Sequence, residues 1–283
     1  MEIADHRNSY EILAPHYDAA YAALNRSAVD LPFYLDQAKQ SGGPVLEIAC
    51  GTGRILLEIA RAGIAIDGVD NSPSMLRVLR ASLERKAPDV RKRVAIHEGD
   101  MRSFRLQKTY PLAIIPFRPF QHMHTVPDQV AALKTAAAHL QEHGCLALDV
   151  FYPKFELLTQ GIGEEKLELE WADESVPGRI VRRYFRRDSV DKIQQVFTGT
   201  FIFRTYEGDN LVREEMESVR LSYYTYPHLR ALFLLAGLEP VEEYGSFSKA
   251  PLDNSATEMI FVLRKQVVAP SRRRGNHRRV PGN

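Results

Sequence analysis

Glycines and carboxylates stand at regular places in the first half of the chain, and their types suit a ligand with several distinct parts. Gly51 and Gly53 lie where a short apolar run ends and an amphipathic stretch begins. The missing side chains let a ligand approach the backbone there, and the N-terminus of a following helix faces it. Glu47, just before the end of that run, can meet an ammonium group, directly or through water. Asp70 ends the next run, where a carboxylate can accept both hydroxyls of a ribose.

A further group follows the third apolar run and suits an adenine ring. Asp100 can accept a hydrogen bond from the adenine amino group, and Met101 can pack on the ring. Gly99 precedes them in a Gly-Asp turn. Met75 can cover the other side of the ring, although its position equally fits a core residue. Together these residues predict a site for a nucleoside that carries a charged amino-acid group.

Two other interpretations of the glycines can be weighed on the sequence. They can mark a plain strand-to-helix turn, in which case Asp70 serves as a helix N-cap or turn residue ahead of Pro73. They can also begin the dinucleotide fingerprint of NAD-binding proteins, whose third glycine would fall at Leu56. The missing glycine argues against NAD, as does the charge of Glu47 on a strand that is usually apolar in those proteins. We therefore favour a cofactor that bears an amino acid.

The elements that must position these residues follow from the hydrophobic pattern. From Pro44 to Phe151, short apolar runs alternate with amphipathic stretches, which indicates a parallel sheet covered by helices. Pro73 and Pro127 suit the first turns of two of these helices. Helical spacing predicts helices over 54–62, 73–85 and 127–141. The apolar runs predict strands over 44–49, 64–70, 93–98, 111–117 and 145–151.

After Pro153 the pattern changes to alternation of apolar and polar residues, which is typical of an antiparallel sheet. This alternation predicts strands over 167–171, 179–185, 194–203 and 212–224. A helix over 228–236 and strands over 241–247 and 259–263 follow. The predicted fold class is therefore α/β with an inserted antiparallel β-sheet. The predicted organisation is a core over 1–155 and 225–265, the insert over 156–224, and a basic, disordered tail over 266–283.

The composition excludes several classes of protein. The chain has 283 residues, with 37 Lys and Arg against 36 Asp and Glu, which gives a formal charge of +1. That balance gives no argument for a polyanionic partner acting over the whole surface. Cys50 and Cys145 do not indicate a disulfide scaffold, and no apolar run approaches the roughly 18 residues of a membrane span. We expect a cytoplasmic protein that neither enters a membrane nor binds nucleic acid.

Three segments, taken in order, resemble a known family. EIACGTGR, GVDNSPSML and EGDM are similar to motifs of class I S-adenosylmethionine-dependent methyltransferases of small molecules, and the resemblance covers roughly residues 10–150. It implies a Rossmann-like sheet of seven strands whose last strand, here 258–263, runs antiparallel to the rest. Ala49 departs from the family, which often has a glycine there. The implied cofactor is S-adenosyl-L-methionine, with S-adenosyl-L-homocysteine as product, bound by Tyr17, Glu47, Ala49, Gly51, Gly53, Asp70, Asn71, Met75, Gly99, Asp100, Met101 and Phe117.

By the same resemblance, the segment YEILAPHYDAAY near the N-terminus is a lid, in which a tyrosine closes over the methionine part of the cofactor. Tyr10 and Tyr17 are the candidates, with Tyr10 also a candidate for contact with the acceptor. Both can instead be the apolar face of a helix. Phe117 would pack on the cofactor, as the equivalent position does in similar enzymes.

The methyl acceptor would lie beside residues 117–124, at the same edge of the sheet. Methyl transfer from a sulfonium is an in-line displacement, so the protein mainly aligns the acceptor and strips water from it. His122 is the candidate general base or orienting group, and Arg118 and His124 are candidate substrate ligands. His122 can instead be an ordinary polar turn residue, and Arg118 can pair with a surface carboxylate. Two histidines without a third ligand are a thin case for a metal, so none is expected.

The expected activity is methyl transfer to N or O of a small-molecule acceptor. Similar insertions occur in bacterial enzymes that methylate small metabolites, including sugar amines, so the inserted sheet would wall the acceptor pocket or form a homodimer contact. One alternative is a cofactor-binding protein without catalysis. Another is an RNA methyltransferase that uses the basic tail and the arginines of the insert as a phosphate track. Against it stands the pairing of those arginines with nearby glutamates; they are Arg182, Arg183, Arg186 and Arg187.

Overall fold

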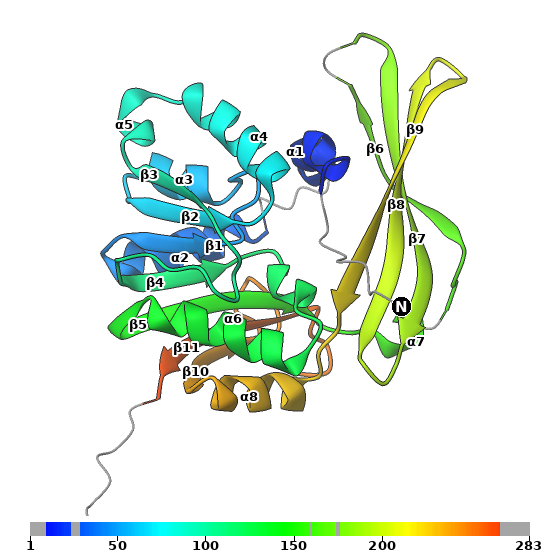
Figure 1. Ribbon diagram of the computed structural model, residues 1–283. Helices are drawn as coiled ribbons and strands as arrows, with labels where there is room; N and C mark the ends of the chain where they lie inside the picture. The colour runs from blue at the N-terminus through cyan, green and yellow to red at the C-terminus, as the bar shows by residue number, and fades with distance from the viewer. Residues whose placement is uncertain (1–9, 24–28, 159, 174–175, 267–283) are drawn as a thin grey trace, which may run out of the picture.

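The computed structural model describes residues 10–23, 29–158, 160–173 and 176–266, and it contains two separate sheets (Figure 1). The larger one has seven strands in the order β10-β11-β5-β4-β1-β2-β3. This confirms the predicted α/β, Rossmann-like fold class with an additional antiparallel sheet. The strands are β1 (Val45–Ile48), β2 (Ile66–Asp70), β3 (Val94–Glu98), β4 (Tyr110–Ile115), β5 (Leu140–Phe151), β10 (Leu238–Tyr244) and β11 (Glu258–Lys265).

The strand directions follow the expectation. β1 pairs in parallel with β2 and β4, and β2 pairs in parallel with β3. β11 is antiparallel to both of its neighbours, β5 and β10, as predicted for the last strand. The carboxyl ends of β1 to β4 therefore meet at one edge of the sheet, and a ligand site at that edge is the usual arrangement in such folds.

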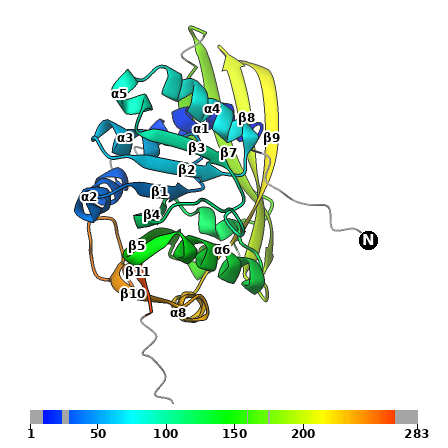
Figure 2. The same cartoon turned by 60° about the vertical axis from the view of Figure 1, so that its left-hand side comes forward.

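Helices cover both faces of this sheet (Figures 1 and 2). One apolar cluster joins the sheet to α6 and α8, through residues such as Leu133 and Phe233. A second joins the opposite face to α2, α3 and α4, through residues such as Tyr34, Ile59 and Leu79. The helices are α2 (Leu31–Ser41), α3 (Leu56–Arg61), α4 (Pro73–Glu84), α5 (Pro88–Arg91), α6 (Val126–Ala138), α8 (Tyr226–Leu235) and the 3-10 helix η2 (Pro119–His122).

Several predicted boundaries are wrong. The helix expected over 127–141 ends at Ala138, because β5 already begins at Leu140. The strand expected over 241–247 runs instead over Leu238–Tyr244. Helix α2 was not predicted. At the helix starts, the sequence was more reliable: Pro73 lies in the first turn of α4, and the Ser72 hydroxyl caps that helix by accepting a hydrogen bond from the Met75 N–H at 3.3 Å.

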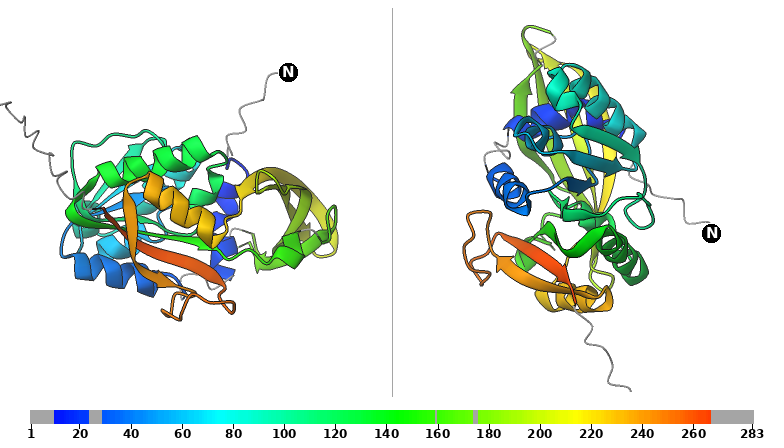
Figure 3. Two further views of the ribbon diagram at one scale, coloured as in Figure 1. Left: turned by 90° about the horizontal axis from the view of Figure 1, so that it is seen from below. Right: turned by 90° about the vertical axis from the view of Figure 1, so that its left-hand side faces the viewer.

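The second sheet stands beside the first and is antiparallel throughout, in the order β6-β7-β8-β9 (Figures 1 and 3). Its strands are β6 (Glu165–Ala172), β7 (Arg179–Asp191), β8 (Val196–Glu207) and β9 (Asn210–Ser222), preceded by the short helix α7 (Phe155–Leu158). The division of the chain into a core, an insert and a tail stays a prediction, and residues 267–283 of the tail lie outside the described residues.

Helix α1 (Leu13–Ala23) lies between the two sheets (Figure 1). Leu13 packs with Val181 and Phe203 of the second sheet, and its backbone N–H donates to the Glu217 carboxylate at 2.6 Å. At the other side, the Thr52 hydroxyl donates to Asp18 at 2.6 Å. The lid segment is thus hydrogen-bonded both to the loop after β1 and to the second sheet.

The four arginines of β7 that the sequence offered as a phosphate track are already engaged. Three of the guanidinium groups contact carboxylates of the same sheet and the fourth contacts a backbone oxygen, so that attraction to a polyanion is largely neutralised. The RNA-methyltransferase alternative is therefore not supported by the structure. The contacts join Arg182 to Glu170 at 2.6 Å, Arg183 to Glu168 at 3.1 Å, Arg186 to Asp188 at 2.7 Å, and Arg187 to the backbone oxygen of Gln160 at 3.2 Å.

Candidate functional site

A cavity of about 810 Å³ opens at the carboxyl edge of the large sheet. The loops after β1, β2, β3 and β4 line it, and α1 and β9 close it from the side of the second sheet. Its volume lies within the range of small-molecule sites. Of the predicted site residues, the cavity is lined by Tyr10, Tyr17, Ala49, Gly51, Asp70, Asn71, Met75, Gly99, Asp100, Met101, Phe117, His122 and His124.

The loop after β1 turns sharply through left-handed backbone. Ala49, Gly51 and Gly53 have φ values of 58°, 54° and 85°. Ala49 thus occupies a conformation that favours glycine, which gives a physical reason for the glycine that related sequences often carry there. Gly53 does not line the cavity; a Cβ at this position would lie 2.2 Å from Leu79, so it serves the turn and the packing of α4.

Asp70 joins two of these loops. One carboxylate oxygen accepts from the Gly51 N–H and the other from the Ser72 N–H, both at 2.8 Å. Burial raises the pKa of Asp70 above its usual value. A carboxylate has about four acceptor positions, so lone pairs remain on the cavity side for ribose hydroxyls. The two sequence interpretations of Asp70, turn residue and ribose ligand, are therefore compatible.

Glu47 lies beneath the glycine loop and does not line the cavity. Its side chain is 2% exposed, and among the described residues its Oε2 atom has no hydrogen-bond partner. Burial raises the pKa of Glu47 well above its usual value, while the nearby Arg54 opposes that shift. A buried acceptor without a donor is costly. An ammonium group bound in the cavity, contacted directly or through water, would satisfy this atom, so the residue fits the expected amino-acid end of the cofactor.

Two residues next to Glu47 were not singled out from the sequence. Arg54 donates two hydrogen bonds to the fully buried Asp30, at 2.7 and 2.6 Å. The guanidinium also lies 5.2 Å from the centre of the Phe117 ring. This bidentate pair fixes the end of the glycine loop against α2. An arginine directly after the second glycine was visible in the sequence, but its partner is distant along the chain.

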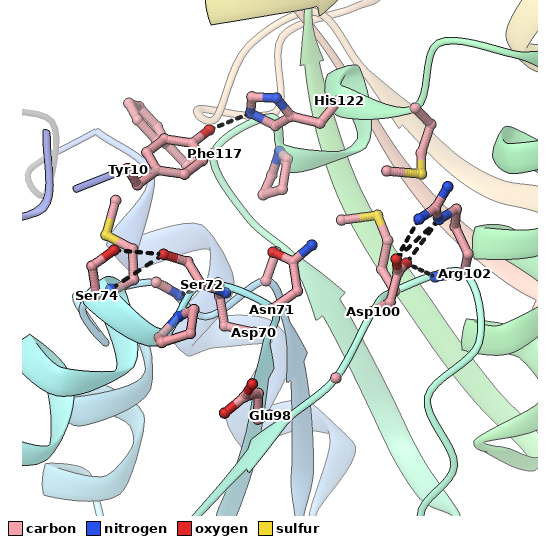
Figure 4. A pocket seen from close by; sticks show the side chains of 18 of the residues that line it. Tyr10, Asp70, Asn71, Ser72, Ser74, Glu98, Asp100, Arg102, Phe117 and His122 are labelled. Carbon is pink, nitrogen blue, oxygen red and sulfur yellow. Dashed lines mark hydrogen bonds and ion pairs between the residues drawn. The ribbon is translucent and has the colours of Figure 1, made fainter. Parts of the chain in front are cut away.

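At the adenine side, Asp100 is held by a partner that the sequence analysis did not assign. Arg102 donates to its carboxylate from the backbone at 2.8 Å and from Nη2 at 2.6 Å (Figure 4). Its Nη1 donates to Asp128 at 3.1 Å. The Asp100 carboxylate is thereby oriented at the cavity wall. Met101 lines the cavity, and Met75 does so while being buried at the start of α4; the contact of Met75 with an adenine ring stays a prediction.

At the opposite side, Tyr10 from the lid segment meets His122 from η2 (Figure 4). The Tyr10 hydroxyl is 2.6 Å from His122 Nε2, and the rings meet edge to face at 5.8 Å. Burial and the neighbouring His124 lower the pKa of His122 to about 4. His122 is therefore neutral at neutral pH. His124 contacts the Ser222 hydroxyl at 3.2 Å, and its pKa is likewise lowered to about 4, mainly by burial.

The turn after β4 carries two adjacent residues in left-handed backbone. Phe117 has a φ of 67°, and its N–H donates to the buried Asp149 at 2.7 Å. Its ring lies against those of Tyr17 and Tyr21. Arg118, with a φ of 70°, does not line the cavity; its guanidinium pairs with Glu258 at 2.5 Å. Arg118 is thus paired with a carboxylate, here a buried one, and its role as a substrate ligand stays a prediction.

Within the described ranges, no group of three or more His, Cys, Asp or Glu side chains could hold a metal ion. Among the same residues, no helix is both long and apolar enough to cross a membrane.

The geometry of this edge agrees with comparisons to known proteins. Residues 45–144 match the family model described as "Methyltransferase domain". Residues 45–144 therefore carry a methyltransferase domain, and the fold of the whole chain is similar to that of S-adenosylmethionine-dependent methyltransferases.

Among similar proteins is a dTDP-3-amino-3,6-dideoxy-alpha-D-glucopyranose N,N-dimethyltransferase of Streptomyces fradiae, 28% identical over 45% of this chain. The alignment spans only about half of that relative, 47% of its length. The cypemycin N-terminal methyltransferase of a Streptomyces species is 24% identical over 88% of this chain and 94% of its own.

A solved structure with a similar fold is the CcbJ methyltransferase from Streptomyces caelestis. Its TM-score is 0.73 at 22% identity, with 92% of this chain and 99% of that chain covered. DesVI of Streptomyces venezuelae has a TM-score of 0.67 at 21% identity, with 94% and 100% covered. Both extend over the second sheet, so the two-sheet architecture is shared.

Proposed function

We propose that this protein transfers the methyl group of S-adenosylmethionine to the nitrogen of a small-molecule amine, of the kind that amino sugars carry. The observation that carries the proposal is the Tyr10–His122 hydrogen bond, at the same cavity that contains Asp70 and Asp100. The relative from Streptomyces fradiae, which is named for an amino-sugar acceptor, supports this substrate class.

The residues of the cofactor half fit S-adenosylmethionine part by part. Asp70 would hold the ribose, Asp100 the adenine amino group, and Glu47 the ammonium end beside the backbone of Gly51. When bound, the cofactor supplies a methyl group on a sulfonium, which is already activated as an electrophile. The chain's own residues then have only to bind the acceptor, orient it and exclude water.

The Tyr10–His122 pair would orient the amine more than deprotonate it. A histidine whose pKa is lowered to about 4 is a weak base, but its neutral ring accepts a hydrogen bond well. With the Tyr10 hydroxyl donating to His122, the phenol oxygen keeps lone pairs that can accept an N–H of the acceptor. That contact turns the nitrogen lone pair toward the methyl group, and the proton released after transfer can leave along the same pair.

The proposal extends to assembly and location. The second sheet would wall the acceptor side of the cavity, and its exposed apolar side chains would support a homodimer; they include Leu167, Leu211, Val212 and Met216. Both cysteines are free, which suits a reducing compartment such as the cytoplasm.

The test is formation of S-adenosylhomocysteine by the full chain with matched acceptor pairs. Each pair comprises an amino sugar and the same sugar with a hydroxyl in place of the amine. We expect turnover with at least one amine and at least 100-fold less with its hydroxyl partner. Equal turnover of both members of the pairs would contradict N-methylation, and failure to bind S-adenosylmethionine in calorimetry would contradict the function as a whole.

A further inference from the structure

Arg220 differs from the other arginines of the second sheet. It lies near the end of β9, is partly buried and lines the cavity. Among the described residues, no carboxylate lies within ion-pair distance of its guanidinium, whereas Arg182, Arg183 and Arg186 of the same sheet each pair with a Glu or Asp. Its charge is therefore directed to the cavity without a counter-ion.

The groups that face Arg220 do not neutralise it. Its backbone interacts with His122, and its positive charge helps to lower the pKa of His124. Both histidines are neutral at neutral pH. Asp128 also lines the cavity, but its carboxylate is held by Arg102 at 3.1 Å and by the Thr125 hydroxyl at 2.8 Å.

The two halves of the cavity differ in their charged groups. The cofactor half contains the carboxylates of Asp70, Glu98 and Asp100 together with Arg77 and with Arg102, which pairs with Asp100, and Glu11 lines the cavity from the lid segment. The acceptor half contains two neutral histidines and Arg220, which pairs with no carboxylate among the described residues. A ligand bound in the acceptor half would displace water from the guanidinium. Such a guanidinium binds best to a carboxylate or a phosphate, whose anionic oxygens match its donors. A free ammonium ion beside it would be repelled, which also favours the neutral form of an amine acceptor.

We propose that Arg220 binds an anionic group of the methyl acceptor, a phosphate or a carboxylate, and so places the acceptor's amine at Tyr10 and His122. This inference rests on the proposed function. It assigns the acceptor to the class of anionic amines, as distinct from neutral amino sugars or uncharged peptide ends.

The experiment uses the full chain saturated with S-adenosylhomocysteine and titrated by calorimetry with two probes. Inorganic pyrophosphate represents a phosphate source, and succinate represents a carboxylate source. We expect one probe to bind the wild type with a Kd below about 10 mM, and Arg220→Gln to weaken that binding at least tenfold. The probe that binds more tightly identifies the source of the anion. Arg220→Lys should restore part of the affinity, because it keeps the charge but loses the planar fork.

Two control variants keep the test specific. Arg213→Gln removes a charge from the same strand, where Arg213 pairs with Glu215 outside the cavity. Arg77→Gln removes an exposed arginine that lines the cofactor half from α4. Neither control should change the affinity for the probe by more than about twofold.

The binding of the cofactor product separates this inference from the proposed function. If S-adenosylhomocysteine binds normally to the wild type and to Arg220→Gln but neither anion binds the wild type, the inference is overturned and the function stands. Equal anion affinity in wild type and Arg220→Gln, or an equal loss in a control variant, overturns it as well. Failure of the wild type to bind S-adenosylhomocysteine overturns the proposed function instead.

Discussion

The two halves of the cavity are built in different ways. The cofactor half consists of loops that directly follow β1, β2 and β3, so its residues fall between positions 49 and 102. The acceptor half joins Tyr10, His122 and Arg220, which come from the lid segment, the turn after β4 and the last strand of the second sheet. The family model covers 45–144 only, so the shared region contains the first half and just part of the second. This difference explains why the methyl donor is easier to assign than the methyl acceptor.

The largest effect should come from the cofactor half. Asp70→Ala removes the ribose ligand and also the acceptor for the N–H groups of Gly51 and Ser72. Since hydrogen bonds to a charged group are worth about 1.5–3 kcal/mol each, the affinity for S-adenosylmethionine should fall by at least 100-fold. Calorimetry of the purified variant measures this loss. Asp89→Ala, on the exposed helix α5, is the control; an unchanged affinity of Asp70→Ala would remove the residue from the site.

A smaller effect, confined to the acceptor half, is expected for the lid contact. His122→Ala should lower kcat about 10- to 100-fold and leave the affinity for S-adenosylhomocysteine within twofold, because the histidine orients the acceptor and not the cofactor. Tyr10→Phe should lower kcat by a similar factor. The double variant should lower kcat little further, since both residues act through one hydrogen bond. Additive losses in kinetic assays would show that the two side chains act independently.

The smallest effect concerns the pH dependence of stability and the acceptor half of the cavity. The pKa of His124 is about 4, against an ordinary value of 6.5, so the unfolded chain binds more protons between these values. This histidine therefore contributes stability at neutral pH that is lost as the pH falls from 6.5 toward 4. Asp149, whose pKa burial raises to about 6, acts in the opposite sense. His124→Gln should show a smaller drop in urea midpoint between pH 7 and 5 than the wild type; an identical drop would contradict the assignment.

The predictability of the site follows the same division. The positions of Asp70, Gly51 and Asp100 at the cavity could be predicted because each lies at the end of a strand or within three residues of it, and parallel strands bring such positions to one edge. The fold class was predictable from the change of hydrophobic period near residue 153. Three contacts around the site could not be predicted, because they join segments that only tertiary packing brings together. They are Arg54–Asp30, Arg118–Glu258 and Phe117–Asp149. Arg220 could not be distinguished from its neighbours by sequence, because only the structure shows which arginines have carboxylates beside them.

The position of α1 between the two sheets ties the cavity to the second sheet. Hydrogen bonds hold this helix on both sides, one to Glu217 and one from Thr52 to Asp18, and its Leu13 packs with Val181 and Phe203. Moving α1 away from the cavity would therefore break apolar contacts as well as hydrogen bonds. Because these contacts come from both sheets, the second sheet takes part in enclosing whatever the cavity binds.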